Sequence, residues 1–135
     1  RQVFIDRKLE PEVLICGAGT GGTIMGVGRA LKRINKDIRI IQVKPAEDAL
    51  NHGIQGIGDG GDYLVNPDFI DEVVYIKTAD AIAKATEMSA NGLLVGISAG
   101  ANVLAAEQVA ETHEGKGAII TFLCDRGERY LSLYS

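Results

Sequence analysis

VLICGAGTGGTIMG, at residues 13–26, contains the pattern that decides the fold of this chain. The apolar run predicts a buried strand, the glycines predict a tight turn, and the segment after them has the apolar spacing of a helix. This strand–turn–helix order is typical of α/β proteins whose glycine-rich turn binds a phosphate group. Gly17, Gly19 and Gly22 also match the G-x-G-x-x-G pattern of dinucleotide-binding loops. The expected ligand is therefore either a dinucleotide or the phosphate of a smaller molecule.

The rest of the chain alternates apolar strand-like segments with helix-like ones. We predict strands at residues 12–18, 38–43, 72–77 and 117–124, an extended segment at 93–98, and helices at 21–35, 78–92 and 99–113. Thr78 is predicted to be an N-cap and Gly92 to follow the end of the same helix. The alternation predicts an α/β fold, a doubly wound and mostly parallel sheet with flanking helices, as a single unit over residues 1–135. Residues 46–66 are glycine-rich and too long for a simple connection, which indicates a functional loop.

Composition excludes several classes of function. The chain has 135 residues, of which 46% are hydrophobic and only 5% aromatic, and its net charge is −4. An acidic chain with scattered basic residues is not expected to bind nucleic acid. No apolar stretch reaches the roughly 18 residues of a membrane span, and two distant cysteines without a C-x-x-C motif indicate a reducing compartment and no zinc site. We therefore expect a cytoplasmic protein that acts on a small molecule, without a metal, a nucleic acid or a membrane as partner.

Three glycine-bearing turns indicate where the ligand binds. They lie at residues 17–22, 96–100 and 124–127, at predicted strand ends or helix starts. Ligands of open parallel sheets bind outside the carboxyl ends of the strands. We expect the site where these turns meet.

The dinucleotide alternative lacks its second feature. An acidic residue about twenty positions after the loop should hold the ribose, but Gln42 or Lys44 occupies that place. A Walker loop is excluded because no Gly-Lys-Ser/Thr follows. A turn that serves only close packing of helix and strand remains the structural alternative.

A single phosphate suits the loop GTGGT better. The glycines allow backbone N–H groups to converge, the threonines add hydroxyl donors, and the helix N-terminus attracts an anion. The residues of this predicted phosphate site are Gly19, Thr20, Gly21, Gly22 and Thr23.

Four motifs together resemble the cysteine synthases (O-acetylserine sulfhydrylases), which are fold-type II pyridoxal-phosphate enzymes. The motifs are GAGTGGTIMG (17–26), GIQGIGDG (53–60), LLVGISAGAN (93–102) and CDRGERYLS (124–132). They occur in the order of that family and extend the resemblance from about residue 12 to residue 132. The resemblance implies that GTGGT binds the 5′-phosphate of pyridoxal phosphate.

The resemblance also implies roles for the other two turns. Ser98, the serine of GISAG, would hydrogen-bond the pyridine nitrogen of the cofactor; its structural alternative is the N-cap of the following helix. Cys124 is the second choice for the pyridine contact. Cys16 is expected to be a packed core thiol. The residues expected at the substrate entrance are Gly56, Ile57 and Gly58.

Two features of the family are missing from these residues. The Schiff-base lysine of the family lies in a segment of the type P-x-x-S-x-K-D-R, and its substrate-carboxylate loop is rich in Thr, Ser, Gly and Asn; neither occurs here. Lys44 stands where relatives carry Glu, and we assign it no catalytic role. We expect residues 1–135 to be the C-terminal, phosphate-binding part of a two-domain enzyme, inactive alone.

The activity implied by the resemblance is pyridoxal-phosphate-dependent β-replacement, which forms L-cysteine from O-acetylserine and sulfide. A cystathionine β-synthase or a serine/threonine dehydratase of the same fold is the alternative within the enzymes. A non-catalytic module that binds pyridoxal phosphate or a partner protein is the alternative outside them. The resemblance further implies a homodimer and serine acetyltransferase as a protein partner.

Overall fold

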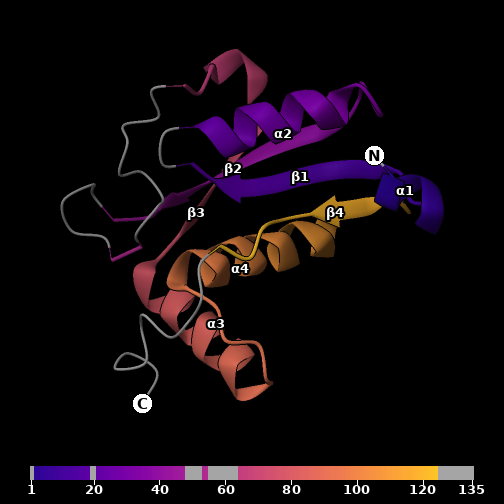
Figure 1. Ribbon diagram of the computed structural model, residues 1–135. Helices are drawn as coiled ribbons and strands as arrows, with labels where there is room; N and C mark the ends of the chain where they lie inside the picture. Colours follow the sequence, from indigo (N-terminus) through magenta and orange to yellow (C-terminus); the bar gives the residue numbers. More distant parts are fainter. Residues whose placement is uncertain (1, 19–20, 48–52, 55–63, 125–135) are drawn as a thin grey trace.

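The computed structural model describes residues 2–18, 21–47, 53–54 and 64–124 of the chain (Figure 1). At its centre lies a four-stranded sheet in the order β3-β2-β1-β4. The strands are β1 (Pro11–Gly17), β2 (Arg39–Pro45), β3 (Glu72–Ile76) and β4 (Ala118–Ile120). Every neighbouring pair is parallel. The parallel α/β sheet expected from the alternating sequence pattern is confirmed.

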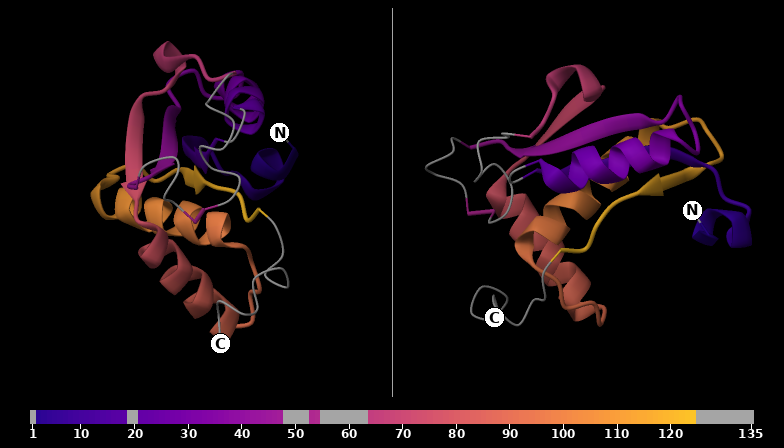
Figure 2. Two further views of the ribbon diagram at one scale, coloured as in Figure 1. Left: turned by 90° about the vertical axis from the view of Figure 1, so that its left-hand side faces the viewer. Right: turned by 45° about the horizontal axis from the view of Figure 1, so that its top comes forward.

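Helices cover both faces of the sheet, as a doubly wound fold requires. They are α1 (Gln2–Arg7), α2 (Gly22–Lys32), the short 3-10 helix η1 (Pro67–Phe69), α3 (Thr78–Ala90) and α4 (Ile97–Thr112). Helix α2 lies on one face, whereas α3 and α4 lie on the other (Figures 1 and 2). Among the described residues, no helix has the length and apolarity that crossing a membrane would require.

Strand β1 supplies side chains to two separate cores because successive residues of a strand point to opposite faces. Leu14 and Cys16 pack with the cluster beneath α2, and Val13 and Ile15 pack with the cluster beneath α4. All four side chains are at most 1% exposed. Since both faces of β1 are buried, its apolar run shows no alternation, as is usual for parallel sheets.

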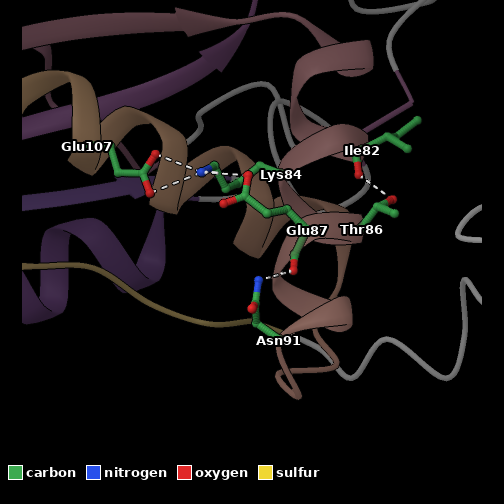
Figure 3. A network of polar contacts seen from close by, with 6 residues as sticks. All are labelled: Ile82, Lys84, Thr86, Glu87, Asn91 and Glu107. Atoms are coloured by element: carbon green, nitrogen blue, oxygen red, sulfur yellow. Dashed lines mark hydrogen bonds and ion pairs between the residues drawn. The ribbon is translucent and has the colours of Figure 1, made fainter.

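Helices α3 and α4 pack closely at a glycine. A Cβ at Gly100 would lie 3.0 Å from the Cβ of Ala85 and would also contact the carbonyl oxygen of Ala81. On the outer side of the pair, Lys84 Nζ of α3 lies 2.9 Å from a carboxylate oxygen of Glu107 of α4 and 3.2 Å from Glu87 (Figure 3). The glycine thus allows the two helices to approach closely, and an ion pair joins their side chains.

Two predicted extended segments differ from the structure. The last strand covers only Ala118–Ile120 instead of residues 117–124, because the next residues leave the ladder and one of them is held by a side chain of α4. The segment 93–98 is not extended throughout, because α4 already begins at Ile97. Gly96, in an extended conformation, is the N-cap of that helix.

The N-cap predicted at Thr78 is also wrong. Lys77 is the N-cap of α3, and Thr78 is the first helical residue. The Thr78 hydroxyl donates to Glu47 Oε2 at 3.1 Å and accepts from the Gly53 N–H at 3.1 Å. The threonine therefore links the helix to the segment after β2. Gly92 follows the end of α3 with a φ of +88°, as predicted.

Candidate functional site

The described parts of the turns selected from the sequence lie near one edge of the sheet. Strand β1 ends at Gly17, α2 begins at Gly22, and α4 begins at Ile97 near the same end (Figure 1). The segment after β4 leads to Cys124 on this side. The carboxyl edge of the sheet is therefore the candidate site, in agreement with the rule for ligands of parallel sheets.

Gly21 shapes the end of the predicted phosphate loop, which comprises residues 17–23. It is the N-cap of α2 with φ +96° and ψ −3°, a left-handed conformation that favours glycine. Its carbonyl accepts the first helical bond, from the Met25 N–H at 3.1 Å. A Cβ at this position would lie 2.6 Å from Val65 Cγ2 and 2.8 Å from the Val65 nitrogen. Both the backbone angle and the close approach of Val65 require glycine here.

The N-terminus of α2 is suited to an anion. Gly21 offers no side chain to cap the helix, and the first turn contains no acidic residue. Gly22 and Thr23, the first two helical residues, are exposed. Their backbone N–H groups lie at the positive end of the helix dipole, which attracts a phosphate. Of the predicted phosphate site, Gly19 and Thr20 lie outside the described residues.

Ser98 is the second residue of α4 and is buried, with 5% of its surface exposed. Because Gly96 is the N-cap, the alternative reading of Ser98 as a helix cap is wrong. The first turn of α4 also contains no acidic residue. Ser98 therefore lies in the first turn of α4, the helix that begins near the carboxyl edge of the sheet.

The two cysteines differ in environment. Cys16 is 1% exposed at the end of β1, as predicted for a packed core thiol. Burial raises its pKa to about 12, and the nearby Cys124 thiol adds a smaller effect in the same direction. Cys124 is exposed. In the described part of the chain, no group of three or more His, Cys, Asp or Glu residues is arranged to hold a metal ion.

Other candidates lie apart from this edge or outside the described residues. Gly56, Ile57 and Gly58, the predicted substrate entrance, lie outside them. His113 follows α4 and lies 2.7 Å from Glu12, at the amino end of β1 and thus at the opposite edge of the sheet. This position gives His113 a structural role.

Asn102 is the site residue that the sequence analysis did not single out. It is 2% exposed in α4, one turn after Ser98. Its Oδ1 accepts from the Gly17 N–H at 2.9 Å, and its Nδ2 donates to the Phe122 carbonyl at 3.0 Å. The available signal was an asparagine within an alanine-rich helix. Such a residue indicates specific hydrogen-bond partners, because a buried amide needs them. The identity of those partners depends on the tertiary structure.

The fold and the candidate site define a class: a doubly wound α/β unit with a glycine-rich turn and an uncapped helix N-terminus at the carboxyl edge of a parallel sheet. A profile of the family described as "Pyridoxal-phosphate dependent enzyme" matches residues 4–125. The chain belongs to this family of pyridoxal-phosphate-dependent enzymes.

Relatives within the family are similar over nearly all of the chain. Cysteine synthase B of Campylobacter jejuni is 41% identical, over 97% of this chain and 46% of its own length. The crystal structure of O-acetyl serine sulfhydrylase isoform 3 from Entamoeba histolytica superposes with a TM-score of 0.88 at 36% identity, over 98% of this chain and 43% of that one. An O-acetylserine dependent cystathionine beta-synthase from Helicobacter pylori has a TM-score of 0.80 at 31% identity, over 97% and 45%. The chain spans about half the length of the curated relatives it matches.

The described residues fit pyridoxal phosphate chemically. The phosphate is an anion, and the uncapped N-terminus of α2 offers neutral donors without a competing carboxylate. The close approach at Gly21 leaves no space for a side chain beside these donors. The hydroxyl of Ser98 suits a ring nitrogen, because it can donate a hydrogen bond to this nitrogen and carries no charge.

Proposed function

We propose that this chain is the phosphate-binding part of a pyridoxal-phosphate-dependent cysteine synthase, which forms L-cysteine from O-acetylserine and sulfide by β-replacement. The observation that carries the proposal is the glycine N-cap of α2, left-handed at Gly21 and without a side-chain cap. The similarity to Cysteine synthase B over 97% of the chain supports the choice of reaction.

Each part of the edge has a task in this proposal. Pyridoxal phosphate, when bound, supplies an electron sink for the bonds at the α-carbon of the amino acid. The backbone of Gly19, Gly21 and Gly22, with the hydroxyls of Thr20 and Thr23, holds the phosphate. Cys124 remains the second choice for the ring contact. Gly56, Ile57 and Gly58 are proposed to line the substrate entrance.

Ser98 sets the electronic character of the site. A hydroxyl does not hold the ring nitrogen protonated as a carboxylate would, so the sink is weaker and favours elimination and replacement over transamination. The sulfur of the product does not come from Cys16, because a buried thiol with a pKa of about 12 has almost no thiolate at neutral pH.

The remaining parts of the proposal concern the whole protein. We infer that the lysine that binds the cofactor covalently lies outside residues 1–135, since no lysine of the chain follows the family pattern. From its composition and cysteine usage we assign the whole protein to the cytoplasm. By the resemblance we propose that it is a homodimer with serine acetyltransferase as a partner.

A second activity has a specific observation in its favour. The Helicobacter pylori relative named as an O-acetylserine dependent cystathionine beta-synthase shares this fold at a TM-score of 0.80. Homocysteine would then replace sulfide as the nucleophile, with the same cofactor and the same phosphate site.

Product analysis with the full-length protein distinguishes the two activities. We expect O-acetylserine with sulfide to give cysteine faster than O-acetylserine with homocysteine gives cystathionine. A faster reaction with homocysteine would make cystathionine formation the main activity and cysteine formation the secondary one. The absence of both products would refute the proposal. Borohydride reduction followed by peptide mapping should place the cofactor on a lysine outside residues 1–135.

A further inference from the structure

Asn102 connects the three segments that form the candidate site. It belongs to α4, like Ser98, and residues four apart lie on the same side of a helix. One of its hydrogen bonds goes to Gly17, where the phosphate loop begins. The other goes to Phe122, two residues before Cys124.

The amide group of Asn102 is used at both ends. The Gly17 N–H needs an acceptor, which is Oδ1, and the Phe122 carbonyl needs a donor, which is Nδ2. Only one orientation of the amide satisfies both partners. An aspartate could accept from Gly17 but could not donate to Phe122 while ionised, and an apolar side chain could do neither.

These two contacts replace sheet pairing that is absent at this point. Among the described residues, the β1–β4 ladder reaches the pair Leu14–Ile120 and continues no further. Beyond it, Gly17 and Phe122 are connected through the side chain of Asn102 and not through a direct strand pair. A buried amide with both hydrogen bonds satisfied is costly to disrupt, which makes this connection a rigid one.

The cofactor proposed above has a rigid ring with a ring nitrogen and a phosphate on a short arm, so the distance between these two groups varies only within narrow limits. It binds well only when the donors for the two ends stand at a fixed separation. We propose that Asn102 is the positioning residue that sets this separation, by holding the phosphate loop at Gly17 and the Phe122–Cys124 segment against the helix that carries Ser98. This inference rests on the proposed function.

The test compares affinities for pyridoxal phosphate and for pyridoxal, which lacks the phosphate. The quantity compared is the dissociation constant of pyridoxal divided by that of pyridoxal phosphate. A change of this ratio from wild type to variant reports the phosphate contribution, because a general loss of stability weakens the binding of both compounds alike. In the cofactor-free full-length protein, Asn102→Ala should lower this ratio about tenfold, the scale expected for a lost buried hydrogen bond. Val109→Ala, a cavity in the same helix away from Gly17 and Phe122, is the stability control and should leave the ratio unchanged.

A second variant separates the two hydrogen bonds and keeps the side-chain volume. Asn102→Asp retains an acceptor for Gly17 and loses the donor to Phe122. Because its carboxylate would also repel a phosphate, this variant is followed by hydrogen exchange and not by the affinity ratio. Hydrogen exchange of the amides at residues 121–124 should rise in both Asn102 variants and not in Val109→Ala.

The outcomes separate this inference from the proposed function. A wild-type protein that binds pyridoxal phosphate no more tightly than pyridoxal would refute the phosphate site itself. A wild-type preference for the phosphate that Asn102→Ala retains in full would refute the positioning role alone. Unchanged exchange at residues 121–124 in both variants would refute the connection to Phe122.

Discussion

At the scale of single residues, Gly21 decides whether the phosphate loop can form. An alanine there would take on a left-handed backbone and push its Cβ against Val65, which lies 2.6 Å away. Gly21→Ala should therefore lower the free energy of unfolding by about 2–4 kcal/mol and weaken pyridoxal phosphate binding at least tenfold. Urea unfolding and cofactor titration measure the two effects.

Gly26 provides the matched control, because it lies in the same helix with nothing within 4 Å of its missing Cβ. Gly26→Ala should stabilise the protein by about 0.5–1 kcal/mol and leave cofactor binding unchanged. If both variants lost stability equally, the left-handed backbone and the close approach of Val65 would not be what requires glycine at position 21.

The raised pKa of Cys16 gives a prediction on the reactivity of its thiol. Its pKa of about 12 means that the thiolate is disfavoured in the folded state. Alkylation of Cys16 by iodoacetamide at pH 8 should be at least a hundredfold slower in the native protein than in urea. Peptide mass spectrometry follows the reaction, and fast native alkylation would contradict the buried position.

Several of these residues could be predicted from the sequence and one could not. Gly21 and Gly92 follow from turn chemistry, and the core position of Cys16 follows from the apolar run around it. The role of Asn102 could not be predicted, because its two partners are 85 and 20 positions away and are backbone atoms without a sequence signal.

At the scale of the elements, the ion pair between α3 and α4 is open to a test by pH. Hydrogen bonds to Glu107 and Glu87 raise the pKa of Lys84 above its ordinary value of 10.5. A raised lysine pKa adds stability that is fully present below pH 10.5 and is lost as pH rises through the raised value.

Lys84→Met should therefore cost stability at pH 7, by less than about 1 kcal/mol because solvent screens the pair. The difference between Lys84→Met and wild type should shrink at pH 12. Lys36→Met, at an exposed turn, should change stability little at either pH. Urea unfolding at the two pH values measures this, and a difference independent of pH would contradict a role of charge.

Element boundaries were the weaker part of the sequence prediction. The three strands β1, β2 and β3 follow from their apolar runs, and α2 follows from the spacing of its apolar residues. The residues at the ends of α3 and the alanine-rich sequence of α4 predicted the other two helices. The last strand was predicted too long, since residues 121–124 are as apolar as the strand before them but lie outside the ladder, and the Phe122 carbonyl bonds to α4. Thr78 was assigned as a cap because of its residue type, whereas Glu47 and Gly53 use its hydroxyl.

At the scale of the whole molecule, the alternation of elements predicted the doubly wound parallel sheet correctly. The same topology predicted that the candidate site lies at the carboxyl edge of the sheet. The strand order and the position of α1 did not follow, because they depend on contacts between distant segments. The family assignment supports the proposal that this glycine loop, which lacks a ribose-binding acid, binds a single phosphate.

The N-terminus of α2 is the proposed binding site for the phosphate end of pyridoxal phosphate. The most direct measurement is the ratio of the dissociation constants of pyridoxal and pyridoxal phosphate for the cofactor-free wild-type protein. A dianionic phosphate at a helix N-terminus with several N–H donors should make pyridoxal phosphate bind at least about a hundredfold more tightly. Equal affinities for the two compounds would contradict a phosphate site at the N-terminus of α2.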